Sequence, residues 1–134
     1  SKAPKVKEVV VSYKFLHDIP IYMQIIDIFR GKILRGELMR GDQMPSVRDV
    51  AMEYGVNPNT VQRAFSEMDR LELTRSERTT GRFVIASDQL IRECRKEESK
   101  NTIKEFIAKM KALGVKREEI IEIIEMIEKG WIDE

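Results

Sequence analysis

MPSVRDVAMEYGVNPNTVQRAF, at residues 44–65, is typical of two short helices joined by a tight turn. Ser46 is a favourable residue to begin the first helix, and an acidic residue three positions later completes a capping box. Gly55 is suited to end that helix, because glycine adopts the left-handed backbone conformation freely. Asn57 is expected to cap the second helix, with Pro58 in its first turn, where a missing N–H costs nothing. The stretch therefore predicts a helix-turn-helix.

Apolar residues recur at helical spacing in both predicted helices and give each of them a face to bury. In the first helix these residues are Val47, Val50, Ala51 and Tyr54. In the second helix they are Val61, Ala64, Phe65, Met68 and Leu71.

The opposite face of the second helix, predicted over residues 58–71, carries donors and acceptors suited to base edges and phosphates. Gln and Asn side chains can each pair bidentately with adenine, and the start of such a helix is the end that enters a major groove. A polar outer face is also what any amphipathic helix has. The tight turn and the capped, polar start make DNA binding the favoured interpretation. The residues of this face are Asn59, Thr60, Gln62, Arg63, Ser66 and Arg70.

Residues 74–86 predict a β-hairpin. Thr, Phe, Val and Ile favour strands, and the sequence RTTG at residues 78–81 is typical of the turn between them. A hairpin directly after a recognition helix is the wing of a winged-helix domain, although an ordinary surface hairpin has a similar sequence. As a wing, its tip is expected to lie along the DNA backbone or in the minor groove. The tip residues are Arg78, Thr80, Gly81 and Arg82.

These motifs resemble the N-terminal domain of GntR-type bacterial transcription regulators. The resemblance rests on Pro45-Ser46-x-Arg48, Val50-Ala51, Gly55-Val56, Thr60-Val61 and Gly81-x-Phe83-Val84. Residues 19–25 and 36–42 match the usual first helix and its exit, and residues 55–61 are most similar to the YtrA subfamily, which has a very short helical tail. The resemblance covers about residues 20–86 in detail.

The resemblance implies contacts with DNA at Arg48, at the helix start and at the wing tip. The sequence also departs from the family pattern. Glu72 stands where the family usually has the glycine that ends the recognition helix, Thr79 replaces the first glycine of the wing, and Arg82 replaces a threonine. Pro58 and Gln62 stand where some relatives have arginines.

Length and charge are compatible with this interpretation without requiring it. A chain of 134 residues holds one compact domain and an appendage. The formal net charge is only +1. Residues 1–86 carry 14 Lys and Arg against 11 Asp and Glu, and residues 87–134 carry 10 against 12. The excess of positive charge thus lies in the half predicted to bind DNA.

Other chemistries find little support in the sequence. The single cysteine, Cys94, excludes an intramolecular disulfide and fits a reducing cytosol, so we expect a cytoplasmic protein. One histidine, His17, and no cysteine cluster argue against a metal site. No apolar run predicts a membrane span, and no nucleophile–base pair or phosphate-binding glycine loop predicts an enzyme or a cofactor.

The region before the helix-turn-helix contributes a helix and a segment of uncertain role. A helix is predicted from Pro20 to about Leu38, with Ile25, Phe29 and Ile33 near one stripe. Residues 9–14 have strand propensity, which fits an edge strand, an arm reaching another subunit or a partly ordered tail.

Residues 87–134 predict a helical tail with more apolar surface than one chain can bury. Residues 88–113 form either one helix or two pieces broken near residues 99–101, and a last helix follows until Gly130. Such a tail either folds back on the winged helix or joins a second subunit, and we favour the dimer. The predicted interface consists of Phe106, Ile107, Met110, Ile120, Ile124 and Ile127.

The predicted fold is mainly α with a small β wing (α+β). A winged helix-turn-helix spans residues 1–86 with an arm at 1–18, and a helical dimerisation tail spans 87–134. The predicted function is that of a dimeric repressor that binds a palindromic operator on double-stranded DNA. The alternative is a winged-helix protein-interaction module. A small-molecule effector, if one exists, would bind between subunits or between tail and winged helix. The predicted DNA-binding residues are Ser46, Arg48, Asn57, Asn59, Thr60, Gln62, Arg63, Thr80, Gly81 and Arg82.

Overall fold

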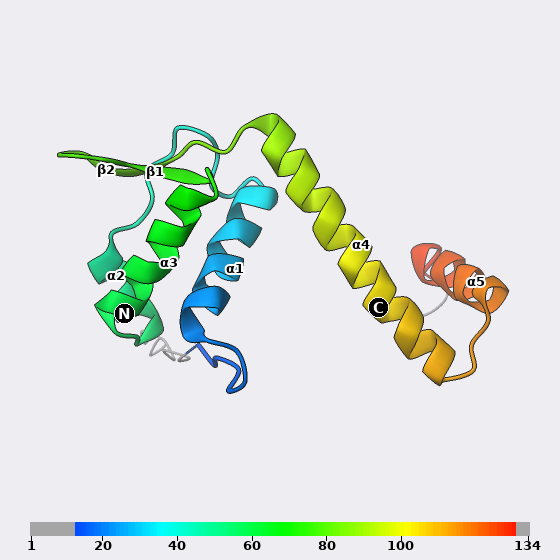
Figure 1. The fold of residues 1–134 in the computed structure, drawn as a ribbon. Helices are drawn as coiled ribbons and strands as arrows, with labels where there is room; N and C mark the ends of the chain where they lie inside the picture. Colours follow the sequence, from blue (N-terminus) through cyan, green and yellow to red (C-terminus); the bar gives the residue numbers. More distant parts are fainter. Residues whose placement is uncertain (1–12, 131–134) are drawn as a thin grey trace, which may run out of the picture. The chain divides into compact units, whose positions relative to one another are not determined.

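The computed structural model describes residues 13–130 and divides the chain into two compact units, residues 1–91 and 92–134. Five helices and one small antiparallel sheet, labelled in Figure 1, confirm the predicted fold class. In chain order the elements are α1 (Ile21–Leu34), α2 (Val47–Tyr54), α3 (Pro58–Arg70), β1 (Thr74–Glu77), β2 (Gly81–Val84), α4 (Asp88–Ala112) and α5 (Arg117–Glu128).

The core of the first unit lies between α1, α2 and α3, and α3 contacts both other helices (Figure 1). Phe29 of α1 meets Phe65 of α3 edge to face, with ring centroids 5.3 Å apart, the geometry that aromatic pairs prefer. The predicted faces of α2 and α3 are confirmed. Their buried members, with the other large apolar side chains of this core, are Ile25, Ile33, Val50, Ala51, Val61, Ala64, Met68 and Val84.

Both predicted N-caps of the helix-turn-helix are present, but among residues 13–130 the Asp49 carboxylate accepts no bond from the Ser46 N–H to complete the predicted capping box. The Ser46 hydroxyl accepts the backbone N–H of Asp49 at 3.0 Å, and the Asn57 side chain accepts the N–H of Asn59 at 2.8 Å. Gly55 ends α2 at φ 66°, in the left-handed region. These contacts fix where both helices begin and where α2 ends, and thereby the turn between them.

The first helix is shorter than predicted. We expected it to run to about Leu38, but α1 ends at Leu34. Gly36 adopts φ 80°, and the backbone N–H groups of Glu37 and Leu38 both donate to the carbonyl of Lys32, at 2.9 and 3.2 Å. The prediction was wrong because the apolar spacing continues past a glycine that already closes the helix.

The segment before α1 is held in place by a buried glutamine. The amide of Gln24 accepts the N–H of Leu16 at 2.8 Å and donates to the carbonyls of Leu16 and Ile19 at 3.0 and 2.8 Å. Nearby, the rings of Tyr13 and Tyr54 lie 5.4 Å apart between centroids. Most of the segment 9–14, for which strand propensity was noted, lies outside the described residues.

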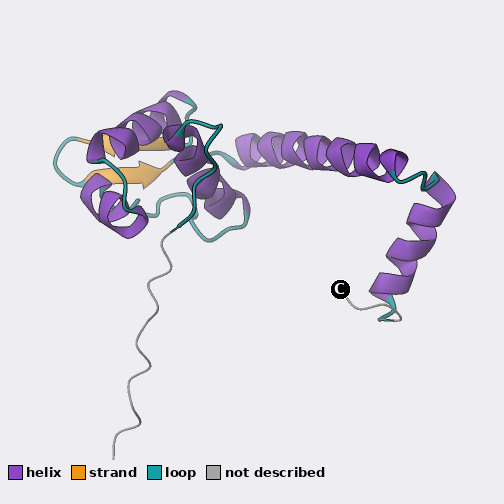
Figure 2. Cartoon of the chain, turned by 90° about the horizontal axis from the view of Figure 1, so that it is seen from below, coloured by secondary structure: helices purple, strands orange, loops and turns teal. Residues whose placement is uncertain are grey.

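The wing is a two-stranded antiparallel hairpin, drawn as two arrows in Figure 2. In the register of β1 and β2, Thr74 pairs with Val84 and Ser76 pairs with Arg82. The loop after α1 runs along the other edge of β2. There Val84 exchanges backbone hydrogen bonds with residues 41 and 42, and the N–H of Met44 donates to the carbonyl of Arg82 at 2.7 Å. β2 is therefore hydrogen-bonded along both edges, to β1 on one side and to the loop that leads into α2 on the other.

A strained corner connects α3 to the wing. Glu72 has φ 61°, a left-handed conformation that costs most residues other than glycine about 1–2 kcal/mol. The backbone accepts it because the N–H of Leu73 donates to the carbonyl of Met68 at 3.1 Å and closes the end of α3. This geometry explains why the family pattern has a glycine where Glu72 stands.

In the second unit, the open question about residues 88–113 is answered by one continuous helix, α4, which begins in the first unit. It ends where Gly114 adopts φ 74° and the N–H of Val115 donates to the carbonyl of Met110 at 3.0 Å. After this turn α5 begins at Arg117. None of the described side chains from residue 92 onward is buried, so this unit has no core of its own.

Candidate nucleic-acid interface

The start of α3 presents a row of polar side chains to solvent. Asn57, Asn59, Gln62 and Arg63 are exposed, and Thr60 is half-buried. The first N–H groups of a helix have no intrahelical partner and carry partial positive charge, which favours a phosphate or a carbonyl edge. The Asn57 cap leaves this end accessible while fixing its geometry. The predicted polar face is therefore exposed at the start of α3, and its contact with DNA stays a prediction.

The orientation of Arg63 is set by an aromatic ring that the sequence analysis did not single out. Its guanidinium lies over the ring of Tyr22, on α1, with the Cζ atom 3.8 Å from the ring centroid. Stacking of this kind leaves the edge N–H groups of the guanidinium free to donate. The packing of α1 against α3 thus positions a cation on the outer face of α3.

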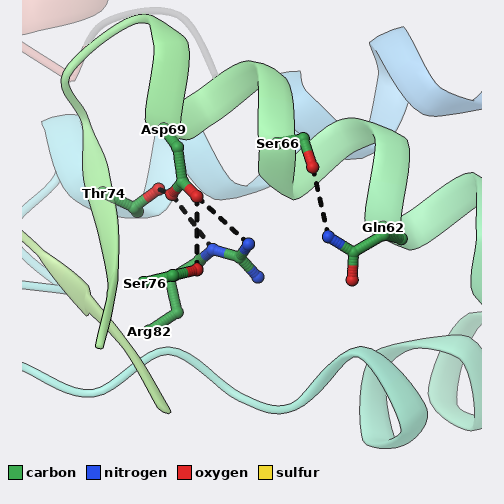
Figure 3. A network of polar contacts seen from close by, with 6 residues as sticks. All are labelled: Gln62, Ser66, Asp69, Thr74, Ser76 and Arg82. Carbon is green, nitrogen blue, oxygen red and sulfur yellow. Dashed lines mark hydrogen bonds and ion pairs between the residues drawn. The ribbon is translucent and has the colours of Figure 1, made fainter. Parts of the chain in front are cut away.

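Gln62 makes an internal contact before any DNA is present. Its side-chain N–H donates to the hydroxyl of Ser66, one turn later on α3, at 3.1 Å (Figure 3). This bond restricts the orientation of the amide. Bidentate pairing with an adenine uses the amide oxygen and one N–H, so the second N–H of Gln62 can keep its bond to Ser66.

Two predicted contacts lie at the start of α2. Ser46 caps this helix with its hydroxyl, so its side chain is already engaged in structure. Arg48 is exposed, and no side chain among residues 13–130 forms a hydrogen bond or ion pair with it. A guanidinium without an internal partner is free to reach a phosphate.

The wing tip is fixed by a glutamine from the loop after α1. The side chain of Gln43 donates to the carbonyl of Thr80 at 2.9 Å. Gly81 follows with φ 115°, and a Cβ atom added there would lie 2.6 Å from the Gln43 Nε2 atom. Glycine adopts this φ without strain, and the bond from Gln43 gives the exposed turn at Thr80 and Gly81 a defined path.

Arg82, also predicted to contact DNA, is held within the protein. Its Nε and Nη2 atoms donate to the two carboxylate oxygens of Asp69, on α3, at 3.0 and 3.1 Å (Figure 3). Its guanidinium lies 5.1 Å from the ring centroid of Phe65, and only 12% of the side chain is exposed. As a DNA contact Arg82 stays a prediction, and its geometry connects the wing to the recognition helix.

The same carboxylate accepts two further hydrogen bonds, both from β1. The hydroxyl of Thr74 donates at 2.6 Å and that of Ser76 at 3.3 Å. Burial tends to raise the pKa of Asp69, but the hydrogen bonds from Arg82 and Thr74 outweigh it and lower that pKa below the ordinary value. The ionised carboxylate therefore stabilises the fold above the ordinary pKa of aspartate, and this contribution is lost as the pH falls through the lowered pKa.

Sequence reasoning missed three residues that position this surface: Tyr22, Gln43 and Asp69. Each acts on a partner at least 13 positions away in sequence, such as Arg63, Thr80 or Arg82. No pattern among neighbouring residues of the sequence indicates such distant pairs. The one available signal was the replacement of the family threonine by arginine at position 82, which calls for a carboxylate nearby.

The helical unit carries the side chains predicted to form a subunit interface. Phe106, Ile107 and Ile124 are each at least 40% exposed, and Met110, Ile120 and Ile127 are half-buried. A hollow of about 590 Å³ lies where α4 and α5 meet, with Ile107, Val115 and Ile120 among its lining. Large apolar side chains exposed in such number mark an unpartnered surface.

The described residues offer no sign of other site chemistry. Between residues 13 and 130, no three histidine, cysteine, aspartate or glutamate side chains gather in a way that could hold a metal ion. None of the helices described is long and apolar enough to cross a membrane.

Fold and site together define a winged helix-turn-helix protein with its recognition helix exposed. Residues 21–84 match the model of the bacterial regulatory proteins of the gntR family. The chain is 37% identical over 117 residues to YhcF of Bacillus subtilis (strain 168), an uncharacterized HTH-type transcriptional regulator; the match covers 87% of this chain and 97% of YhcF. It is 32% identical over 110 residues to the HTH-type transcriptional repressor YtrA of the same organism, covering 81% and 84%.

A solved GntR-family regulator from Listeria monocytogenes superposes with a TM-score of 0.73 at 32% identity, covering 83% of this chain and 97% of that one. The chain belongs to the GntR family. It is therefore a DNA-binding transcription regulator of bacterial type and not an enzyme, and the resemblance to YtrA is confirmed.

Replacing Gly81 by alanine should destabilise the protein. The new methyl group would meet Gln43, and φ 115° is strained for any L-residue, so we expect the free energy of unfolding to fall by about 1–3 kcal/mol. Urea denaturation measures this change. Thr80→Ala is the matched control, because only the backbone carbonyl of Thr80 binds Gln43. A Gly81→Ala protein that unfolds at the same urea concentration as the parent would contradict the assigned conformation.

Proposed function

We propose that this regulator is a homodimeric repressor that reads a two-fold symmetric operator through α3 and the wing. The observation that carries the proposal is the exposed, capped start of α3, where Asn59, Gln62 and Arg63 stand clear of the core. Membership of the family supplies the DNA-binding class. The side chains on this surface supply the means to distinguish sequences.

Repression is supported by the relative YtrA, which is named a transcriptional repressor. A protein bound at an operator can repress simply by occupying DNA that RNA polymerase needs. In a bacterium that DNA lies in the cytoplasm, which is therefore the proposed location of this protein.

Dimerisation is supported by the state of the helical unit. The isoleucines between residues 103 and 127 and Phe106 are exposed or half-buried, and no described residue from position 92 onward is buried. Removing such side chains from water is worth about 25 cal/mol per Å² of apolar surface. A second copy of the same unit offers an equal apolar surface, and a two-fold interface pairs each patch with itself.

Selection of bound duplexes from a random pool tests the proposal as a whole. We expect the purified protein to enrich a palindrome whose half-sites are centred about one helical turn apart, the separation that two recognition helices of a compact dimer can span. Binding should weaken as salt concentration rises, because phosphate contacts release counterions. A pool without any enriched sequence would favour the alternative, a winged-helix module that binds a protein partner.

Single variants should distinguish contacts with the DNA backbone from contacts with the bases. Arg48→Ala removes an unpaired cation, so we expect weaker binding to every duplex and a salt slope smaller by about one unit. Asn59→Ala and Gln62→Ala should each cost roughly 1–3 kcal/mol at one base position and relax the preference there. Fluorescence anisotropy with the selected operator and its single-base variants measures both effects.

The Arg70→Ala variant serves as a control for loss of a cation on α3, since Arg70 is already paired with Glu67 on the same helix. If Arg48→Ala, Asn59→Ala and Gln62→Ala all bound the operator as tightly as the parent, the assigned reading surface would be wrong.

A charge in the helical unit should separate the subunits. Ile124→Glu would place a carboxylate opposite apolar side chains, and an unpaired buried carboxylate costs several kcal/mol. We expect a folded monomer in sizing chromatography with light scattering, because the first unit keeps its own core. Operator affinity should fall by two or more orders of magnitude as linked binding is lost.

Met39→Glu is the matched control: it adds the same charge at an apolar side chain that is 61% exposed, but in the first unit. An Ile124→Glu protein that stayed dimeric with unchanged affinity would place the interface elsewhere.

A further inference from the structure

The wing and the recognition helix are joined through one carboxylate. Asp69 lies in the last turn of α3 and faces the hairpin, where it accepts four hydrogen bonds from Thr74, Ser76 and Arg82 (Figure 3). These three residues share one face of the wing, since Ser76 and Arg82 are paired in register and Thr74 lies two positions before Ser76. Both strands of the wing are thereby bound to the same side chain.

The geometry of the pair is that of a rigid connection. Two parallel N–H groups of Arg82 meet the two carboxylate oxygens of Asp69, the bidentate arrangement that fixes direction as well as distance. Phe65, one turn before Asp69 on α3, lies under the guanidinium. With 12% of Arg82 and 28% of Asp69 exposed, the pair is shielded from solvent far more than the surface pair of Arg35 and Glu37, whose side chains are 60% and 55% exposed.

We propose that Asp69 is the positioning residue of the wing, and that Arg82 acts on DNA binding through Asp69 and not by touching DNA. This inference rests on the proposed function, in which α3 and the wing engage one operator together. The carboxylate sets the place of the wing relative to the end of α3. Because the tip at Thr80 and Gly81 directly precedes Arg82 in β2, fixing Arg82 fixes the approach of the tip to the duplex.

The two possible roles of Arg82 predict opposite effects when Asp69 loses its charge. If Arg82 contacts a phosphate, Asp69→Asn releases it and removes a negative charge close to DNA, so operator binding should stay the same or become stronger. If Asp69 positions the wing, Asp69→Asn should weaken binding. We expect a loss on the order of tenfold, within the range by which contacting charged groups are coupled.

The same logic applies to Arg82 and to the double variant. Arg82→Gln should weaken binding about as much as Asp69→Asn, with a salt slope within a few tenths of the parent value. A phosphate contact would instead lower that slope by about one unit. The double variant Asp69→Asn, Arg82→Gln should bind the operator no more weakly than either single variant. Each single substitution already breaks the contact between the two residues, so the second removes nothing further.

Glu67→Gln is the matched control for charge. Glu67 lies on α3 two residues before Asp69, and among the described residues its carboxylate accepts hydrogen bonds only from Arg70 of the same helix. The Glu67→Gln substitution removes a negative charge from α3, as Asp69→Asn does, without releasing the wing. Its operator affinity should stay within about twofold of the parent, in the direction of tighter binding.

Hydrogen exchange in the free protein tests the connection without DNA. In Asp69→Asn the amides of residues 81–84 should exchange several-fold faster, while amides of α1 exchange as in the parent. A general loss of stability would instead accelerate both sets together. Unchanged exchange at residues 81–84, or operator binding equal to the parent, overturns the inference. If the unsubstituted protein binds no duplex, the proposed function is wrong. The hydrogen-exchange experiment would still test whether Asp69 positions the wing.

Discussion

The helix α3 contributes to two surfaces at once, the buried core and the exposed polar face. The inner face of α3 carries Phe65, which meets Phe29 across the core, and the outer face carries the exposed polar side chains that we propose read DNA. An α-helix is rigid over 13 residues, so whatever fixes the inner face also fixes the direction of the outer one. The caps at Ser46 and Asn57 and the turn at Gly55 then set where that helix starts. The packing of the core therefore determines where the exposed polar face of α3 points.

Around α3, side chains from distant parts of the sequence hold more exposed groups in fixed positions. Tyr22 supports Arg63, Gln43 holds the turn at Thr80, and Asp69 gathers both strands of the wing. Each is a specific contact between a packed element and a more exposed one. The helical unit differs: its described apolar side chains are exposed or half-buried, and in the proposed dimer a second copy would cover them.

The sequence was sufficient for features that are local. Helix caps, the αL glycine at Gly55 and the buried stripes of α2 and α3 depend on residues within a few positions of each other, and all were predicted correctly. The end of α1 was not, because apolar spacing continued beyond Gly36 while the backbone had already turned. Residue roles on the site depend on pairs distant in sequence. Arg82 illustrates the difference: the sequence predicts a DNA contact for an arginine at a wing tip, but it does not indicate the bond to Asp69 at 3.0 Å.

Glu72 marks a corner where the fold carries a local cost. It occupies the left-handed corner after α3 at φ 61°, where glycine is the residue without strain. In the genetic code, glutamate and glycine codons differ by one base, so the unstrained form lies a single mutation away. The surrounding structure holds the strained residue in place. The corner is therefore a ready starting point for engineering a more stable regulator.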